Sequence, residues 1–284
     1  MFIVQVVGGI GNQLFQYVFG QYLSEKYKQN VVYDIRYYNN PKSPRLCELE
    51  NIDPDLMIYK SNHLYFNTFN AFSYKIWKLL FLLNPHNSVI QERNFKNEPL
   101  NLGNPKYCFY FQGYWQDVKY IDYLKPLIFF NNLEYQVESE IIYYKKTIEA
   151  EINPVGIHVR RGDYFLSDNV DIYGICDSNY FSNAIKCIFE KVNNPRFFVF
   201  SDDLDWVKNN IQLPLNTIFI NNFNIKQFSY IYLMSLCKHT IISNSSFSWW
   251  GAYLNRNKHK EIICPSKWTL LSEDTLALDS WIKL

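Results

Sequence analysis

The sequence predicts an α/β protein with two Rossmann-like lobes, each built on a parallel sheet covered by helices. One observation comes from the N-terminus, where residues 2–35 read as strand, glycine-rich turn, helix and strand. The other comes from the C-terminal half, where short apolar runs alternate regularly with helical patterns. Asn153-Pro154 interrupts the chain just before that half, so we expect lobes at residues 1–152 and 153–284.

The sequence indicates some secondary-structure elements of the first lobe clearly and others poorly. Residues 2–7 form an apolar run that ends at consecutive glycines, and apolar residues then recur at helical spacing up to residue 28. Residues 31–35 predict the next strand. The stretch 37–104 is rich in Asn, Pro and Tyr and predicts loops with short helices. Beyond it we expect a strand at 107–111 and a helix at 137–149.

The elements of the second lobe follow one another cleanly. We expect strands at 155–160, 196–200, 217–220, 240–243 and 261–264, and helices at 178–192, 204–211, 226–237 and 247–254. Strands separated by single helices run parallel, because the crossover returns the chain to the same end of the sheet.

Composition excludes several classes of protein. With 48% hydrophobic and 19% charged residues, the chain is not intrinsically disordered, and a net charge of +1 argues against a nucleic-acid partner. Six scattered cysteines without a C-x-x-C pair predict buried, reduced thiols in a cytoplasmic protein. The strongest apolar stretch, residues 76–83, is too short to span a membrane and contains Lys78.

The first motif is the turn Gly8-Gly9-Ile10-Gly11-Asn12-Gln13. Glycines between a strand and a helix let backbone N–H groups approach a phosphate or a sugar. Leu14 stands where the dinucleotide fingerprint needs its last glycine, so taken alone a tight structural turn is the better interpretation. Asn12 and Gln13 are candidates for helix caps or for amides that face a ligand.

The second motif, His158-Val159-Arg160-Arg161-Gly162-Asp163-Tyr164, lies at the carboxyl end of a predicted strand, where open α/β sheets bind ligands. Two arginines there are costly to bury without an anion, and a guanidinium matches a diphosphate. The structural alternative is an ion pair between Arg161 and Asp163, which accounts for one arginine only.

The third motif, Ser201-Asp202-Asp203-Leu204-Asp205, opens a helix. We expect Ser201 or Asp202 to cap it, with Asp205 in the first turn and Asp202 as a ligand contact. Asp203 and Asp205 also spell D-x-D, the pattern that holds a divalent ion in metal-dependent glycosyltransferases.

The fourth motif, Ser243-Asn244-Ser245-Ser246-Phe247-Ser248, joins a strand to a helix. Its hydroxyls and free N–H groups suit a phosphate cradle without a lysine. Capping explains any one serine but not the whole group.

Five stretches resemble glycosyltransferase family 11, the α-1,2-fucosyltransferases. They occur in order over nearly the whole chain as GGIGNQLFQYVFG at the N-terminus, FQGYWQ (111–116), IHVRRGDY (157–164), FVFSDD (198–203) and ISNSSFSWWGAYLN (242–255). The resemblance implies a GT-B fold with a nucleotide-sugar cleft between an acceptor-side N-terminal lobe and a GDP-sugar-binding C-terminal lobe.

The activity that the resemblance implies is inverting transfer of L-fucose from GDP-L-fucose to the 2-hydroxyl of a galactose-terminated glycan, without a metal or other cofactor. It assigns Arg160 to the donor diphosphate, Asn12 to the vicinity of the donor, and Ser246, Phe247 and Ser248 to phosphate and nucleoside. We add Ser245, His158 and Asp202 as donor-side candidates. Many members have His-Gly where this chain has Tyr173-Gly174, and no role is carried to that position.

The chemistry leaves some alternatives open. Departure of GDP adds negative charge that arginine and a helix N-terminus can meet. Inversion suggests a general base, for which Asp163 and His158 are the nearest candidates, or a late proton transfer without one. The other hypotheses are a metal-dependent transferase using Asp203 and Asp205 and a non-catalytic sugar-nucleotide-binding protein. Peripheral association with a membrane that carries a lipid-linked glycan also stays open.

Overall fold

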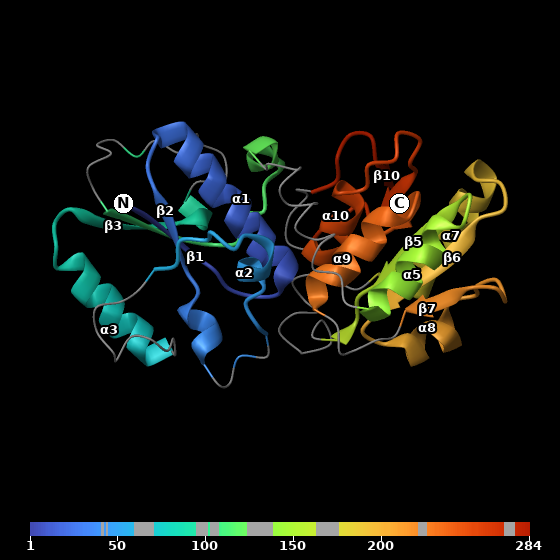
Figure 1. Cartoon of the computed structure of the whole chain (residues 1–284), viewed down its shortest axis with the longest axis horizontal. Coiled ribbons are helices and arrows are strands. Elements are labelled where there is room, and N and C mark those ends of the chain that lie inside the picture. The colour runs from blue at the N-terminus through green and yellow to red at the C-terminus, as the bar shows by residue number, and fades with distance from the viewer. Residues whose placement is uncertain are drawn as a thin grey trace. The chain divides into compact units, whose positions relative to one another are not determined.

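The computed structural model describes residues 1–40, 43, 45–59, 71–94, 102, 108–123, 139–162, 176–220, 226–269 and 276–284. The chain divides into two compact units, Met1–Tyr135 and Gln136–Leu284 (Figure 1). This division lies earlier than the boundary that we expected near residue 152. Helix α5 (Ser139–Glu149) packs against α9 (Gln227–Leu236) and therefore belongs to the second unit.

The first unit contains a parallel four-stranded sheet with strand order β2-β1-β4-β3. Its strands are β1 (Phe2–Gln5), β2 (Val31–Asp34), β3 (Asn87–Gln91) and β4 (Cys108–Gln112). The α-helices described in this unit are α1 (Ile10–Tyr27), α2 (Leu49–Ile52) and α3 (Ala71–Leu82), and the 3₁₀ helices are η1 (Arg36–Asn39), η3 (Glu92–Asn94) and η4 (Val118–Tyr123).

Aromatic side chains fill the layers on both faces of this sheet. On one face, Phe19 of α1 stacks on Trp115 with ring centroids 3.9 Å apart and also meets Phe111 of β4 edge to face. On the other face, Trp77 of α3 lies 4.6 Å from the ring of Tyr110. Because alternate residues of a strand point to opposite faces, neighbouring aromatic residues of β4 serve different layers.

The second unit contains a parallel six-stranded sheet with strand order β10-β9-β8-β5-β6-β7. Its strands are β5 (Pro154–Val159), β6 (Arg196–Ser201), β7 (Ile218–Ile220), β8 (His239–Ile241), β9 (Ile262–Cys264) and β10 (Ile282–Lys283). The other α-helices described in this unit are α7 (Ser178–Lys191), α8 (Leu204–Asn210) and α10 (Ser246–Tyr253).

The central strand β5 separates two layers of side chains. Val155, Ile157 and Val159 lie in a buried cluster with residues of α7 and α8. His158 points the other way and stacks on Phe247 of α10. The alternation along β5 therefore places the imidazole on the α10 side of the sheet, as the sequence pattern predicted.

The elements that local pattern marked are present, with ends shifted by a few residues. Helix α3 and strand β3 lie inside the stretch 37–104, for which we expected loops and short helices, and β10 was not predicted. All six cysteines are free, but Cys47, Cys108 and Cys187 are only partly buried, so the expectation of buried thiols holds for the other three. Within the described ranges, the helices are too short or too polar to cross a membrane.

Candidate active site

The ends of three neighbouring strands bring the polar motifs of the second unit together. Strands β8, β5 and β6 are adjacent and parallel, so their carboxyl ends share one edge of the sheet. Ser243 follows β8, Arg160 follows β5 and Asp202 follows β6. Residues that lie more than 80 positions apart in the chain thus meet where open α/β sheets bind ligands.

Arg160 is held from both neighbouring strand ends. Its Nη1 lies 2.7 Å from Oδ2 of Asp202, and both side chains are partly exposed. Its backbone N–H donates to Oγ of Ser243 over 3.1 Å. The Ser243 hydroxyl in turn donates to the carbonyl of His158 over 2.7 Å. The guanidinium is therefore oriented at the strand end rather than left to move freely.

Arg161 has a different set of contacts. Its Nε lies 3.4 Å from Oδ2 of Asp203, and its guanidinium carbon lies 3.7 Å from the ring centre of Trp206. Its backbone N–H donates to Oδ1 of Asp202 over 2.9 Å. The expectation that only one arginine would find a carboxylate is therefore wrong, because two aspartates of the β6–α8 turn pair with the two arginines. Asp163, the partner that we expected for Arg161, lies outside the described residues.

Helix α8 begins at a different cap from the one that we expected. Asp203 is the N-cap, and its Oδ1 accepts the backbone N–H of Trp206 over 3.0 Å. Ser201 supports the turn, since its Oγ accepts the N–H of Asp203 over 2.9 Å. Asp205 lies in the first turn, as predicted. The capping interpretation is thus right and the capping residue is Asp203, whose carboxylate serves both the helix and Arg161.

The part of the chain that the structure describes contains no group of side chains that could bind a metal ion. No three His, Cys, Asp or Glu side chains of these residues lie close enough together to hold an ion. Asp203, half of the D-x-D pattern, already accepts a backbone N–H and pairs with Arg161.

His158 occupies an apolar, cationic neighbourhood. Its ring stacks on Phe247 with centroids 4.9 Å apart, and Nδ1 is buried without a hydrogen-bond partner. Burial, together with the charge of Arg160, lowers the pKa of His158 to about 3. The imidazole is therefore neutral at physiological pH and a weak proton acceptor, which favours a packing role over the predicted role as a base.

The serine-rich turn divides into an inner and an outer part. Ser243 and Ser248 are fully buried, and Oγ of Ser248 lies 3.1 Å from the carbonyl oxygens of both Ser243 and Ser245. Ser248 therefore stabilises the turn, contrary to the expected contact with phosphate or nucleoside. Ser245 is the N-cap of α10 but makes no capping side-chain bond, and Ser246 and Phe247 are half-buried. Ser245 is itself buried, so the outer part, Ser246 and Phe247, is the segment suited to a ligand.

The glycine turn of the first unit has mostly internal partners. Gly8 has a φ of +86°, and a Cβ there would lie 2.7 Å from Nδ2 of Asn12, which explains the glycine. Gly9 is the N-cap of α1, so neither Asn12 nor Gln13 caps the helix. Gln13 is fully buried; it donates to the carbonyl of Leu46 and accepts the N–H of Glu48.

Asn12 joins two of the motifs that are distant in the sequence. Its Oδ1 accepts a hydrogen bond of 2.7 Å from Nε2 of Gln116, and Nε2 of Gln16 donates to the carbonyl of Gly113 over 2.9 Å. The start of α1 and the loop after β4 are therefore locked together. We had assigned no role to Gln116, and only its place in the stretch FQGYWQ pointed to one.

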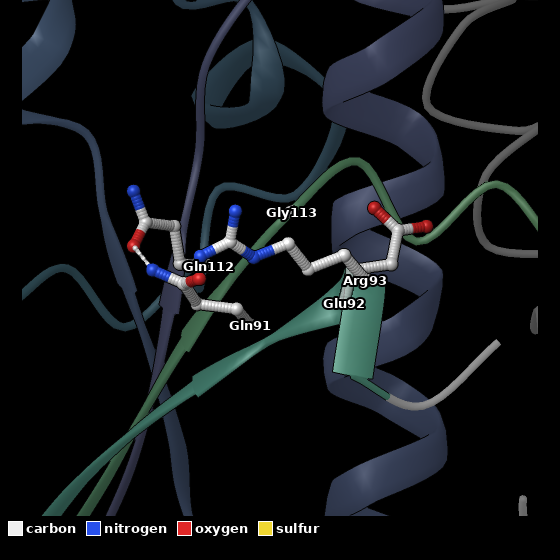
Figure 2. Close-up of a pocket in the computed structure, with 5 residues that line it drawn as sticks. All are labelled: Gln91, Glu92, Arg93, Gln112 and Gly113. Carbon is white, nitrogen blue, oxygen red and sulfur yellow. Dashed lines mark hydrogen bonds between the residues drawn. The ribbon is translucent and has the colours of Figure 1, made fainter.

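A pocket of about 340 Å³ lies at the carboxyl ends of β3 and β4. Figure 2 shows its lining residues, with the side chain of Arg93 extending toward the amides of Gln91 and Gln112. Nε2 of Gln91 lies 3.4 Å from Oε1 of Gln112, which also accepts the hydroxyl of Tyr74 over 2.8 Å. Sequence reasoning missed this site. Gln91, Glu92 and Arg93 come from a stretch without a readable pattern, and Gln112 and Gly113 were given no role although they belong to the stretch FQGYWQ.

Comparison with known proteins gives a consistent result. The whole chain, residues 1–284, matches the family model described as glycosyl transferase family 11. An O-antigen biosynthesis glycosyltransferase, WbnK of Escherichia coli, is 31% identical, with 98% of each chain covered. An α-1,2-colitosyltransferase of Escherichia coli is 32% identical over 94% of this chain and 91% of its own. Bovine galactoside α-(1,2)-fucosyltransferase 2 is 34% identical over 35% of this chain and 30% of its own.

Among solved structures, NodZ α-1,6-fucosyltransferase co-crystallized with GDP is similar at a TM-score of 0.50 and 12% identity, over 88% of this chain and 90% of its own. At this identity the likeness concerns the fold. It confirms the predicted α/β architecture of the GT-B type.

Proposed function

This chain belongs to glycosyl transferase family 11, and on that premise we propose that it transfers L-fucose from GDP-L-fucose to the 2-hydroxyl of a galactose in a glycan, with inversion and without a metal. The observation that carries the proposal is the meeting of Arg160, Asp202 and Ser243 at the ends of three adjacent strands. A protein of this family is a glycosyltransferase; the donor sugar, the linkage and the acceptor are the proposal.

Arg160 is proposed to bind the diphosphate of the donor. Arginine has five N–H donors in a planar fork, and this geometry matches the oxygens of a diphosphate. Asp202 would orient the guanidinium, and Ser243 would fix the backbone beneath it. A cation held in this way needs little reorganisation when negative charge develops on departing GDP, which is the arrangement that accelerates such a step.

The first turn of α10 is proposed to supply the second contact with the donor. Ser245 and Ser246 stand at the helix N-terminus, where the helix dipole favours an anion. Phe247, which is half-buried and stacked on His158, is proposed to contact the nucleoside. In this arrangement His158 positions Phe247 and stays neutral beside Arg160, while Asp163 is kept as the proposed proton acceptor.

The first unit is proposed to bind the acceptor. The pocket at the ends of β3 and β4 offers the amides of Gln91 and Gln112 and the guanidinium of Arg93, groups that hydrogen-bond sugar hydroxyls. Asn12, held by Gln116, is proposed to contact the transferred sugar.

A second candidate is transfer of colitose, the 3-deoxy form of fucose, to the same hydroxyl. The similarity over nearly the whole chain to a bacterial α-1,2-colitosyltransferase favours it. The two donors differ by one hydroxyl. A site that hydrogen-bonds this hydroxyl rejects the deoxy sugar strongly, whereas a site that only packs against the sugar does not. Comparing kcat/KM for GDP-fucose and GDP-colitose separates the two.

Donor binding is tested by thermal shifts with GDP. A ligand at about 100 times its Kd stabilises the folded protein by about 2.7 kcal/mol. We expect Ser246→Ala and Phe247→Ala to reduce this shift, and Asn12→Ala to preserve it while lowering turnover of GDP-fucose. Ser266→Ala, an exposed serine of the same unit, is the matched control. Loss of GDP binding in Asn12→Ala alone would mean that the nucleotide was assigned to the wrong unit.

A further inference from the structure

Helix α3 carries an apolar surface that faces away from the core of its unit. Figure 1 shows α3 as an outer helix of the first unit. Its inner side chains, Tyr74, Trp77 and Phe81, belong to the cluster that packs on the sheet. Six large apolar residues nevertheless have 38–73% of their surface exposed. Leu82 lies to one side, and the other five form one stripe: Phe72, Ile76, Leu79, Leu80 and Leu83. We name these five residues the α3 outer face.

The spacing of the α3 outer face is that of one helical stripe. At about 100° per residue, its members fall within an arc of about 100°, and the inner residues are centred on the opposite side. Leu83 directly follows the helix and continues the stripe. Single exposed apolar residues are ordinary, but a contiguous patch of five marks a surface that contacts something apolar.

The charges beside the patch indicate what that partner is. Lys75 is exposed, Lys78 is half-buried, and both lie on one flank of the α3 outer face. Residues 71–83 contain no Asp or Glu. An apolar stripe with lysines on its flank and no acidic residue fits a lipid surface with anionic headgroups. The apolar side chains enter the acyl boundary and the ammonium groups stay among the phosphates.

We propose that α3 binds the surface of a membrane containing anionic lipid, lying in the plane of the interface. With 12 residues, the helix is too short to span the hydrocarbon core. The proposal stands on this surface alone and does not depend on the identity of the donor sugar. For a glycosyltransferase, it would hold the first unit where a lipid-linked glycan is presented.

Vesicle flotation of the full-length protein tests the proposal. We expect the wild type to float with vesicles of phosphatidylglycerol and phosphatidylcholine, and much less with phosphatidylcholine alone. In Leu79→Ser/Leu83→Ser, partitioning should fall at least about tenfold, since two side chains that enter the acyl boundary are lost. Lys75→Gln/Lys78→Gln should lose the preference for anionic vesicles. The control Ile152→Ser/Leu215→Ser removes two isolated side chains that are even more exposed and should float like the wild type.

Three measurements can overturn the proposal. Wild type that stays with the soluble fraction at every vesicle composition contradicts it, and so does a Leu79→Ser/Leu83→Ser variant that floats equally well. A wild type that is dimeric in sedimentation velocity without lipid, and monomeric after the same substitution, would assign the face to a second copy of the chain. Transfer to a water-soluble acceptor, measured in parallel, should be equal in all variants; its absence from the wild type would count against the proposed function and leave the vesicle result valid.

Discussion

Replacing Arg160 with alanine should separate the chemistry from the fold. The ion pair with Asp202 is short, at 2.7 Å, but both side chains are partly exposed, and such pairs contribute about 1 kcal/mol or less to stability. After the substitution, Oδ1 of Asp202 still accepts the 2.9 Å hydrogen bond from the backbone N–H of Arg161, and Oδ2 can be hydrated. We therefore expect the Tm to fall by no more than about 4 °C.

The effect on transfer should be far larger. If Arg160 meets the charge that develops on the departing diphosphate, its loss removes one preorganised donor, which typically lowers kcat by about 100- to 1000-fold, or about 2.7–4 kcal/mol. Arg160→Lys should also be poor, because an ammonium group cannot reproduce the forked geometry of a guanidinium.

The assay is transfer from GDP-fucose to a soluble galactoside, with thermal denaturation of each variant measured alongside. Arg196→Ala is the matched control, since Arg196 begins β6 and so lies at the opposite end of that strand from Asp202. Its kcat should stay close to that of the wild type. An Arg160→Ala protein that folds normally and keeps more than a tenth of the wild-type kcat would refute the role given to this residue.

Two further predictions concern metal and pH. Transfer should survive EDTA, because Arg160 and the start of α10 are proposed to meet the phosphate charge; loss of activity that Mn²⁺ restores would favour Asp203 and Asp205 instead. The pKa of His158 is about 3 when folded and 6.5 ordinarily, so between these values the unfolded chain binds the extra proton and stability falls on acidification. From pH 7 to pH 5, urea unfolding should show a loss of stability that is smaller by about 2 kcal/mol in His158→Gln and unchanged in His259→Gln, an exposed histidine. The loss that remains in His158→Gln includes the part due to His239, because burial lowers the pKa of His239 to about 4. An equal loss in His158→Gln and in the wild type would contradict the buried, neutral imidazole.

Local pattern predicted the second unit well for a physical reason. Its strands are buried on both faces and its helices have one apolar side. The residues of each strand or helix are therefore enough to predict that element. Helix α3 was missed because it is apolar on two opposite sides, with Trp77 inward and Leu79 outward, which hides the helical period. Strand β3 was missed because it is only half-buried and reads as polar.

The candidate site shows a similar limit. The sequence placed Arg160 and Asp202 at strand ends, where the structure has them, whereas Ser246 is the first residue of α10. It could not predict that Asp202 pairs with Arg160, or that Ser243 bridges to His158, because these contacts depend on which strands are neighbours. The bond between Asn12 and Gln116 joins residues 104 positions apart and was equally hidden.

The central claim is the reaction itself, and product analysis tests it most directly. The purified protein is incubated with GDP-β-L-fucose and a galactose-terminated oligosaccharide, and the product is examined by mass spectrometry and NMR. The account predicts one added deoxyhexose, α-linked to the 2-hydroxyl of the galactose, with release of GDP. Linkage to another hydroxyl, retention of the β configuration, or binding of the donor without any transfer would contradict it.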